Sequence, residues 1–339
     1  SRALLIFSIP MIIGNLFQQA YTIVDSAIVG RYVGETALAA VGASYALTSI
    51  FICIAIGGGI GASVIISHHF GAHNYGRMKT CIRTALLSFL FISLILGGIG
   101  LIFSQQIMEV LNTPADAIDI AVTYLNIYFL GLPFLFMYNI LSSMFNALGE
   151  SRIPLYLLIF SSVLNIFLDL YMVAVLNLGV AGAAYATFIA QGISAVLSLI
   201  IFVVTLQKLP GKADGWLSKT EFSDMSRIAL PSILQQSTVS IGMMLVQSVV
   251  NSFGTQILAG FSAAMRIESL CVVPMSAIGN AMSSYTAQNI GAEKEERISQ
   301  GYRTGNFMII VIAVILCLFL EIAHKPLIAL FLDNAASSQ

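Results

Sequence analysis

FGAHNYGRMKTCIRTAL, residues 70–86, returns as IGAEKEERISQGYRTGN at residues 290–306, without a gap. Gly71 aligns with Gly291, so the two copies are offset by 220 positions (291 − 71). Further pairs in this register are Ala72 with Ala292, Arg77 with Arg297, and Thr84 with Thr304. Self-similarity at a fixed offset indicates a duplicated architecture. The chain is therefore predicted to contain two copies of one unit.

The sequence around the repeat is too apolar for a soluble protein. Of the 339 residues, 58% are hydrophobic and only 9% are charged, whereas soluble domains average about 25% charged residues. Uncharged runs of about 18 or more residues recur, and each is long enough to cross a bilayer. Strands of a membrane barrel would alternate in polarity, and these runs do not. The predicted fold class is an all-α polytopic membrane protein.

Breaks rich in charged residues, Gly, Pro or Asn divide the chain into nine predicted spans. Their approximate limits are 4–29, 37–66, 83–104, 119–146, 153–176, 180–205, 226–251, 256–284 and 304–323. One repeat unit contains six spans, so both copies enter the membrane in the same direction. Copies arranged in this way are related by a pseudo-twofold axis along the membrane normal.

The duplication also predicts how the chain is divided. We expect an N-lobe at 1–205 with helices one to six, a cytoplasmic linker at 206–222, and a partial C-lobe at 223–339 with helices seven to nine. The second copy is expected to be truncated after the ninth helix, so that helices ten to twelve lie outside this sequence. The start at Ser1 falls in mid-pattern, and we expect residues to precede it.

Basic residues indicate the orientation in the membrane. The connections after even-numbered spans carry Arg77, Lys79, Arg83, Arg152, Lys208, Lys212, Lys219, Lys294, Arg297 and Arg303. The connections after odd-numbered spans carry only Arg31 and Lys325. By the positive-inside rule the even connections are cytoplasmic. We therefore predict a multi-pass protein of the cell (cytoplasmic) membrane whose N-terminus is cytoplasmic.

Two acidic residues lie well inside spans of the first half. Asp25 lies in span one and Asp169 in span five, and no basic partner for them is evident in this half. An Asp at the centre of a membrane helix costs about 2.5–3.5 kcal/mol on insertion scales. Counted at 1.5 Å per residue, both Asp residues and Thr187 of span six lie at a similar depth in the outer half of the membrane. With Asn165, they predict a site for a proton or a small cation such as Na⁺.

Three stretches carry a resemblance to a known family. They are IPMIIGNLFQQAYTIVDSAIVGRYVGETALAAVG (9–42), NIFLDLYMVAVLNLGVAGAAYAT (165–187) and QNIGA (288–292). They resemble the multidrug and toxic compound extrusion (MATE) family of prokaryotic type, in motifs, in order and in the six-plus-six repeat. This resemblance implies a secondary active antiporter, not an enzyme. Such a protein exports amphipathic organic compounds, drugs or toxins, in exchange for protons or sodium ions by alternating access.

The resemblance also assigns residues. In the proton-linked branch of the family, the residues that match Asp25, Asn165, Asp169 and Thr187 form the N-lobe cation site, and the proline that matches Pro10 kinks helix one. A sodium-associated branch has a Glu in helix seven, where the alignment places Val239 here. The coupling ion therefore stays open between H⁺ and Na⁺, and a Na⁺ ion would bind at the same four residues. No cofactor is expected besides this ion.

Further polar residues inside the spans predict a substrate cavity. Gln18 and Tyr21 share a face with Asp25 at the spacing i, i+3, i+7, and Asn139 lies on span four. Aromatic and Met side chains in such a cavity would suit amphipathic organic cations. The expected partners are a small cationic or amphipathic organic molecule and the lipid bilayer, with no nucleic acid, and the protein is expected to be a monomer.

Two other functions fit parts of the sequence. A lipid-linked oligosaccharide flippase of the same superfamily would line its cavity with basic residues, but only Arg266 lies well inside a span. An intramembrane aspartyl protease would use two membrane Asp residues as a dyad. The stretches TIVD and IFLD lack the Gly-x-Gly-Asp pattern of those enzymes, and the duplication argues against a protease.

Three short motifs predict structure instead of chemistry. GGGIG (57–61) has no preceding strand and no following Lys, so close helix packing is favoured over a phosphate loop. The pair His68 and His69, at the cytoplasmic end of span two, is expected to be solvated and not to bind metal. SKTE (218–221) fits a capping box and predicts a helix start before span seven.

Pro10 lies inside the first predicted span, where it removes one backbone hydrogen bond and clashes with the carbonyl one turn earlier. We therefore predict a bend near residues 6–10, below Asp25, that ion binding would bias. A Pro10→Ala protein is expected to have a straighter first helix and slower transport, while it still binds the coupling ion. Transport rate and ion affinity of the two proteins check this; an unchanged transport rate would contradict a hinge at Pro10.

Overall fold

The computed structural model describes residues 2–33, 35–111, 117–251, 253 and 255–331. Within them the chain forms nine long α-helices, one π-helical turn and no strand. The elements are α1 (Arg2–Tyr32), α2 (Glu35–Gly71), α3 (Tyr75–Val110), α4 (Ile118–Ala147), α5 (Arg152–Asp169), η1 (Leu170–Val175), α6 (Gly179–Gln207), α7 (Lys219–Asn251), α8 (Thr255–Gly291) and α9 (Glu295–Phe331). Eight of the helices contain a described stretch that is long and apolar enough to span a bilayer. The predicted all-α polytopic fold is confirmed.

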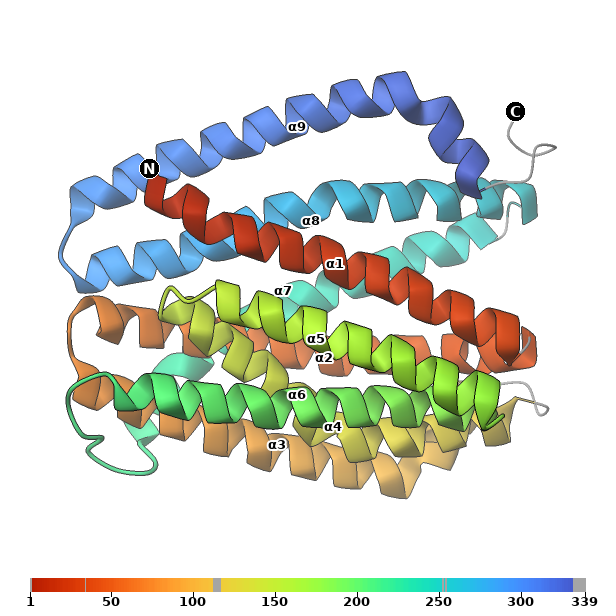
Figure 1. Cartoon of the computed structure of the whole chain (residues 1–339), viewed down its shortest axis with the longest axis horizontal. Helices are drawn as coiled ribbons and strands as arrows, with labels where there is room; N and C mark the ends of the chain where they lie inside the picture. Colours follow the sequence, from red (N-terminus) through yellow and green to blue (C-terminus); the bar gives the residue numbers. More distant parts are fainter. Residues whose placement is uncertain (1, 34, 112–116, 252, 254, 332–339) are drawn as a thin grey trace.

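The helices run up and down alongside one another (Figure 1). The N-terminus and the connections α2–α3, α4–α5, α6–α7 and α8–α9 lie at one end of the bundle, on the left in Figure 1, and the other connections lie at the opposite end. Several helices begin before the predicted spans, because a helix continues past the apolar run into polar residues. α3, for example, begins at Tyr75, and the side chain of Asn74 caps it by accepting a hydrogen bond from the backbone N of Arg77 at 3.3 Å.

The first six helices pack around α4, which contacts α2, α3 and α6, while α5 lies against α6 and α1. Glycines let α2 approach its neighbours closely. A Cβ on Gly57 would lie 2.6 Å from Ile233 of α7, and one on Gly61 would lie 2.6 Å from the carbonyl oxygen of Met225. The GGGIG stretch is therefore a helix-packing surface, as predicted.

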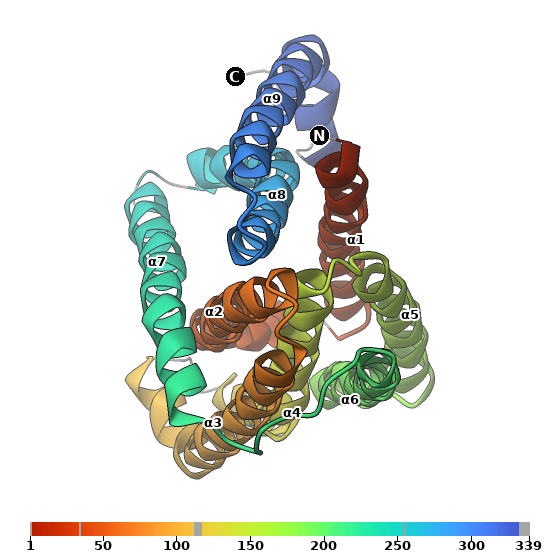
Figure 2. The same cartoon turned by 90° about the vertical axis from the view of Figure 1, so that its left-hand side faces the viewer.

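The second half repeats the packing of the first (Figure 2). α7 packs along α2, and α8 packs along α1 and α2. In the repeat, α1 corresponds to α7 and α2 corresponds to α8. The α2–α7 contact is therefore equivalent to the α8–α1 contact, as a pseudo-twofold axis requires. The turns after α2 and α8 also match, since His73 has a φ of 56° and Glu293, 220 positions later, has a φ of 55°.

A reciprocal contact marks where the two repeats meet. A Cβ on Gly71 at the end of α2 would clash with the carbonyl oxygen of Gln288 on α8. A Cβ on Gly291 at the end of α8 would clash with the carbonyl oxygen of His68 on α2. His68 and Gln288 are themselves 220 positions apart, so the two contacts are the same contact seen from the two repeats. Gly71 and Gly291 therefore form a crossing of α2 and α8 that leaves no room for a side chain. We call it the glycine crossing.

The start of α7 corrects one prediction and partly confirms another. The Oγ of Ser218 accepts a hydrogen bond from the backbone N of Glu221 at 3.3 Å, so Ser218 caps the helix as predicted. The Glu221 side chain does not reach back to complete the capping box. It is buried, and it pairs with Nε2 of His69 at 3.0 Å and with Arg77 at 3.1 Å. His69 is therefore not solvated as expected, because Glu221 of the second repeat covers it; His68 is exposed.

The linker between α6 and α7 is fastened to the start of α3. Lys79 donates from Nζ to the carbonyl oxygen of Leu209 at 2.7 Å and to that of Gly211 at 2.9 Å. The hydroxyl oxygens of Thr80 and Thr84 accept hydrogen bonds from the backbone N of Asp214 and Ser218, at 2.9 and 3.0 Å. Side chains of the first repeat thus hold the entrance to the second.

The glycine crossing predicts the effect of a single methyl group. Gly291→Ala is expected to lower the free energy of unfolding by about 1–3 kcal/mol, because the new Cβ overlaps the backbone of α2. A Cβ added at Gly279 on the same helix would have no atom within 4 Å, so Gly279→Ala is expected to be neutral or to stabilise by up to about 1 kcal/mol. Unfolding in mixed micelles measures both; equal effects would contradict the crossing.

Candidate functional site

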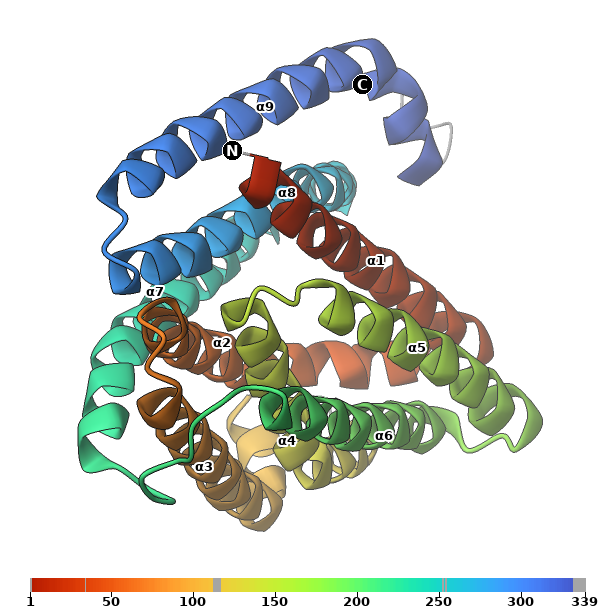
Figure 3. The same cartoon turned by 60° about the vertical axis from the view of Figure 1, so that its left-hand side comes forward.

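The four residues predicted to bind an ion come together between α1, α5 and α6, which lie side by side (Figure 3). Asp25 is on α1, Asn165 and Asp169 are one turn apart on α5, and Thr187 is on α6. Asn165 is 2% exposed and Asp169 is fully buried. Three helices that are distant in the sequence thus contribute to one buried polar cluster.

Asn165 is the centre of this cluster. Its amide nitrogen donates to Oδ2 of Asp169 at 2.9 Å and to the hydroxyl of Tyr21 at 2.7 Å. Its amide oxygen accepts from Oγ1 of Thr187 at 3.3 Å. The opposite amide orientation would turn oxygen toward the Asp169 carboxyl, so the hydrogen-bond partners determine the orientation. One amide thereby connects α5 to both α1 and α6.

The carboxyl groups of Asp25 on α1 and Asp169 on α5 lie close enough to interact directly. An ionised carboxylate can only accept a hydrogen bond, so a hydrogen bond between the two groups would require a proton on one of them. Oδ1 of each residue is buried without a hydrogen-bond partner. Neither carboxyl group forms an ion pair with a described Lys, Arg or His, so no described cation neutralises this carboxyl pair.

A π-helical turn follows the carboxylate on α5. The turn η1 begins at the residue after Asp169, and the backbone N of Leu176 donates to the carbonyl oxygen of Tyr171 at 3.0 Å. Turns of this kind often occur at functional sites, where they alter the direction of side chains. Composition did not indicate this turn, because its residues (LYMVAV) are as apolar as those of an ordinary membrane helix.

A polar cavity of about 490 Å³ lies beside the cluster, and we call it the N-lobe cavity. Residues of α1, α2, α4, α5, α6 and α8 line it. The predicted cavity residues Gln18, Tyr21 and Asn139 all lie in its wall, as does Pro10. α1 passes through Pro10 without interruption, so the proline does not end the helix, and the bend stays a prediction.

Several site residues were not predicted from the sequence. Tyr124 on α4 lies close enough to Asp25 and Asp169 to interact with both electrostatically. Asn280, Ser283 and Ser284 of α8 line the N-lobe cavity from the other repeat, and Oγ of Ser284 lies 3.3 Å from Oγ of Ser63 on α2. The sequence of a single helix does not point to these residues, because the packing of several helices brings them to the site.

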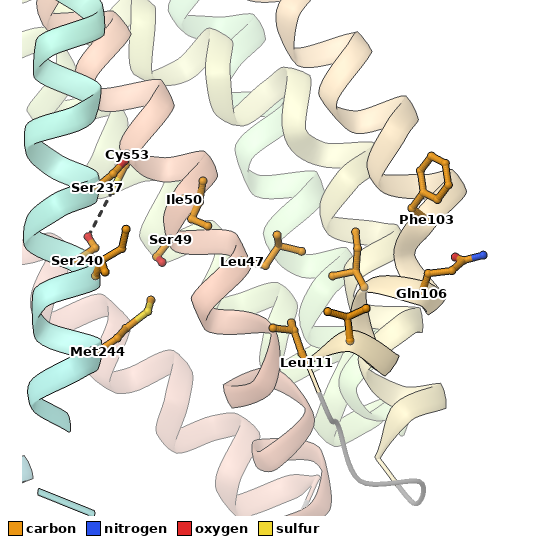
Figure 4. Close-up of a pocket in the computed structure, with 13 residues that line it drawn as sticks. Leu47, Ser49, Ile50, Cys53, Phe103, Gln106, Leu111, Ser237, Ser240 and Met244 are labelled. Atoms are coloured by element: carbon orange, nitrogen blue, oxygen red, sulfur yellow. Dashed lines mark hydrogen bonds between the residues drawn. The ribbon is translucent and has the colours of Figure 1, made fainter. Parts of the chain in front are cut away.

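A second cavity of about 400 Å³ lies between α2, α3 and α7 (Figure 4). Its wall is mainly apolar, with Leu47 and Ile50 on α2, Phe103 on α3 and Met244 on α7. Sγ of Cys53 lies 3.5 Å from Oγ of Ser240 across it. Its described lining contains no charged group, and this cavity is separate from the predicted site.

Some predictions lie outside the described residues. The side chain of Arg266, the basic residue weighed for the flippase, is among them. Among the described residues, no group of three or more His, Cys, Asp or Glu side chains is placed to hold a metal ion.

A duplicated helical bundle that encloses a carboxyl pair and a polar cavity is typical of membrane transporters. Residues 10–171 and 231–339 match the MatE family, which is most of the chain. The chain belongs to this family, and the predicted resemblance is confirmed.

Two curated relatives come from Bacillus subtilis (strain 168). The probable multidrug resistance protein YpnP is 32% identical over 297 residues, which are 88% of this chain and 66% of that protein. The probable multidrug resistance protein YoeA is 30% identical over 345 residues, which are 98% and 74%. A crystal structure of MATE in complex with MaL6 superposes with a TM-score of 0.93 at 25% identity, over 98% of this chain and 75% of that one. This chain thus spans about two thirds to three quarters of the length of these relatives.

The hydrogen bonds of Asn165 predict that two buried polar residues, Asn165 and Ser194, differ in their contribution to stability. Asn165→Ala removes one hydrogen-bond partner from each of Asp169, Tyr21 and Thr187, so it is expected to lower the free energy of unfolding by at least about 2 kcal/mol. Ser194 on α6 is also buried, but its Oγ has no partner, so Ser194→Ala is expected to be neutral or stabilising. Unfolding in mixed micelles compares the two. A loss for Ser194→Ala as large as that for Asn165→Ala would contradict the hydrogen-bond network.

Proposed function

We propose that the protein acts as a secondary active antiporter, which exports amphipathic organic compounds in exchange for protons or sodium ions by alternating access. One observation carries this proposal. The buried carboxyl pair of Asp25 and Asp169 has no basic partner among the described residues, and Tyr21, Asn165 and Thr187 belong both to its surroundings and to the wall of the N-lobe cavity. The names of the multidrug resistance relatives agree with export of toxic compounds.

The carboxyl pair has the chemistry to hold either ion. A proton would be held between the two neighbouring carboxyl groups, with one group donating it to the other. A sodium ion would meet oxygen atoms of Asp25, Asp169 and Thr187, and oxygen is the ligand that hard cations prefer. The buried Oδ1 atoms of both Asp residues are free to accept it. The amide oxygen of Asn165, which faces Thr187, is the fourth proposed oxygen ligand of a sodium ion, and Tyr21 holds this amide in place through a hydrogen bond.

The same geometry links the ion to the cavity. Asp25 is on α1 and Asp169 is on α5, so an ion between them holds the two helices together. After the ion leaves, two ionised carboxylates would repel each other strongly in an apolar surrounding. α1 would then move away from α5, and the wall of the N-lobe cavity would change, because α1 supplies Pro10, Gln18 and Tyr21 to it. Ion binding and substrate binding thus favour different positions of α1.

We base the proposed orientation in the membrane on the helix connections that carry Lys and Arg residues. The end with the N-terminus and the even connections is assigned to the cytoplasm of the cell membrane. The glycine crossing of α2 and α8 lies at that end (Figure 1), which supports closure of the cytoplasmic side. We also propose 1–205 as the N-lobe, 206–222 as the linker and 223–339 as part of the C-lobe. The lining of the N-lobe cavity contains no Lys, Arg or His among the described residues, so a flippase is not supported.

Asp25→Asn removes the titratable group but keeps its size and its hydrogen-bonding capacity. The variant is expected to insert normally and to lose efflux driven by an ion gradient, because the site can no longer release and rebind a proton or bind Na⁺ as a pair. Dye efflux from vesicles, driven in turn by a pH gradient and a sodium gradient, measures this and identifies the ion. Asp169→Asn is expected to act in the same direction, with a smaller loss because Asp25 remains.

Asp119→Asn provides the matched control, since Asp119 is exposed in the first turn of α4. It removes the same charge outside the site and is expected to leave efflux unchanged. Purified protein adds a measurement that does not need transport, the uptake of protons or Na⁺ at equilibrium. Wild-type ion uptake and efflux by Asp25→Asn, at equal expression, would contradict the proposed coupling site.

A further inference from the structure

The linker between α6 and α7, residues 208–218, runs along the first turns of α3. Its early part lies at Lys79, which donates from Nζ to the carbonyl oxygen of Gly211 at 2.9 Å. Its later part lies one helical turn further along α3, where Nη1 of Arg83 donates to the carbonyl oxygen of Gly215 at 3.4 Å. The linker therefore descends from the end of the bundle along the side of α3, by about 6 Å between these two contacts.

Trp216, the only tryptophan of the sequence, lies at the deeper of the two contacts. The guanidinium carbon of Arg83 is 4.8 Å from the centre of the indole ring, a distance at which a cation–π contact holds the ring in place. The residue is nevertheless 71% exposed, and Leu217 beside it is 62% exposed. The described part of the protein thus leaves two adjacent large apolar side chains mostly uncovered.

One face of α3 shows where this point lies relative to the hydrocarbon of the bilayer. Leu87, Phe91 and Leu94 are exposed, and they follow Arg83 at steps of four, four and three residues, so all of them lie on one helix face. An exposed apolar stripe on a spanning helix faces lipid. Arg83 and the indole of Trp216 lie one turn before this stripe begins, at the level where hydrocarbon meets headgroups. Tryptophan is enriched at that level, because its ring is apolar and its N–H is polar.

The second repeat leaves this face of α3 open to lipid. α9, the counterpart of α3, packs on α8 and touches α1, and among the described residues it has no extensive contact with α4, α5 or α6. By the pseudo-twofold relation, the helices predicted to follow α9 would not pack on α3 either. The exposed side chains of the linker and of α3 therefore face the bilayer.

Positive charge surrounds the two apolar side chains of the linker. Residues 208–219 contain three lysines and one acidic residue, Asp214, which gives a net charge of +2 (3 − 1). The three are Lys208, Lys212 and Lys219. All of them are exposed, and none forms an ion pair with a described Asp or Glu. Lysines at a membrane surface attract anionic headgroups.

We propose that the linker is a lipid-anchoring surface, in which Trp216 and Leu217 enter the bilayer interface and the three lysines hold anionic phospholipid headgroups. The order of the groups along α3 matches the order in a bilayer. Lys212 follows Gly211 near the end of the bundle, and Trp216 lies one turn deeper. This inference goes beyond the proposed transport function and does not depend on it, because the surface lies outside both the carboxyl pair and the N-lobe cavity.

The single tryptophan makes the surface measurable without a label, because all indole fluorescence of the protein comes from Trp216. The purified protein is placed in nanodiscs of phosphatidylcholine and phosphatidylglycerol in equal parts. Bromine atoms, which quench an indole at contact, are carried high on the acyl chains of either one lipid or the other. Both brominated lipids are expected to quench, and brominated phosphatidylglycerol at least about twofold more strongly, because the lysines concentrate it locally. Salt at about 1 M is expected to remove this preference, since it reduces the screening length to about 3 Å.

Two triple variants test the physical cause, and each replaces three exposed basic residues by glutamine. The first changes the linker: Lys208→Gln, Lys212→Gln and Lys219→Gln. It is expected to lose the preference for phosphatidylglycerol, while quenching by brominated phosphatidylcholine remains. The second is the matched control and changes the α8–α9 connection and the start of α9: Lys294→Gln, Arg297→Gln and Arg303→Gln. These residues lie at the same end of the bundle but on the side away from the linker (Figure 2), so the preference is expected to persist.

Each outcome decides the proposal. Equal quenching of the wild type by the two brominated lipids would overturn it, and this comparison needs no variant to fold. Quenching by neither lipid would overturn it as well, because Trp216 would then lie in water. An unchanged preference in the linker variant, or an equal loss in both triple variants, would also overturn it, because the linker lysines would then not be the groups that hold the anionic lipid.

Discussion

A carboxyl group between membrane helices has to find its partners within the protein, because the surrounding hydrocarbon offers none. Here Asp169 is fully buried, lies against Asp25 and accepts a hydrogen bond from Asn165, which also donates to Tyr21. These bonds join α1 to α5, and Asn165 extends the connection to Thr187 on α6. The arrangement of the three helices depends on this cluster, and so does the wall of the cavity that they line.

The two repeats meet under a different constraint, the approach of one backbone to another. At the end of α2 and of α8 there is room for glycine only, because the opposing atom is a carbonyl oxygen of the other helix. Gly57 and Gly61 also allow α7 to pack closely along α2. Such contacts gain van der Waals packing over a long surface and do not need apolar side chains to be removed from water. They also leave the polar groups of α2 and α8 facing the cavity.

The end that carries the glycine crossing is reinforced by polar contacts. Glu221 joins the first turn of α7 to His69 and Arg77, and Gln288 donates to the carbonyl oxygen of Ala147 at 2.7 Å. A buried carboxylate with two partners is a specific connection between the repeats. In the proposed alternating access this end would have to loosen, and the connection would contribute to the barrier between the two states.

The sequence by itself determined the elements and part of the site. Apolar runs set the number of helices, the repeat at 70–86 and 290–306 set their pairing, and helical spacing placed Asp25, Asp169 and Thr187 at one depth. These features are local, because a membrane helix has a known rise and must satisfy its own backbone.

Only the tertiary structure decided how the helices face one another. It placed Tyr124 and the serines of α8 at the site, it buried His69 against Glu221, and it separated the carboxyl pair from the cavity by neutral side chains. These relations join residues on helices far apart in the chain. They depend on the rotation of each helix about its axis, and inside a membrane that rotation is set by side-chain packing against neighbouring helices, which no single span encodes.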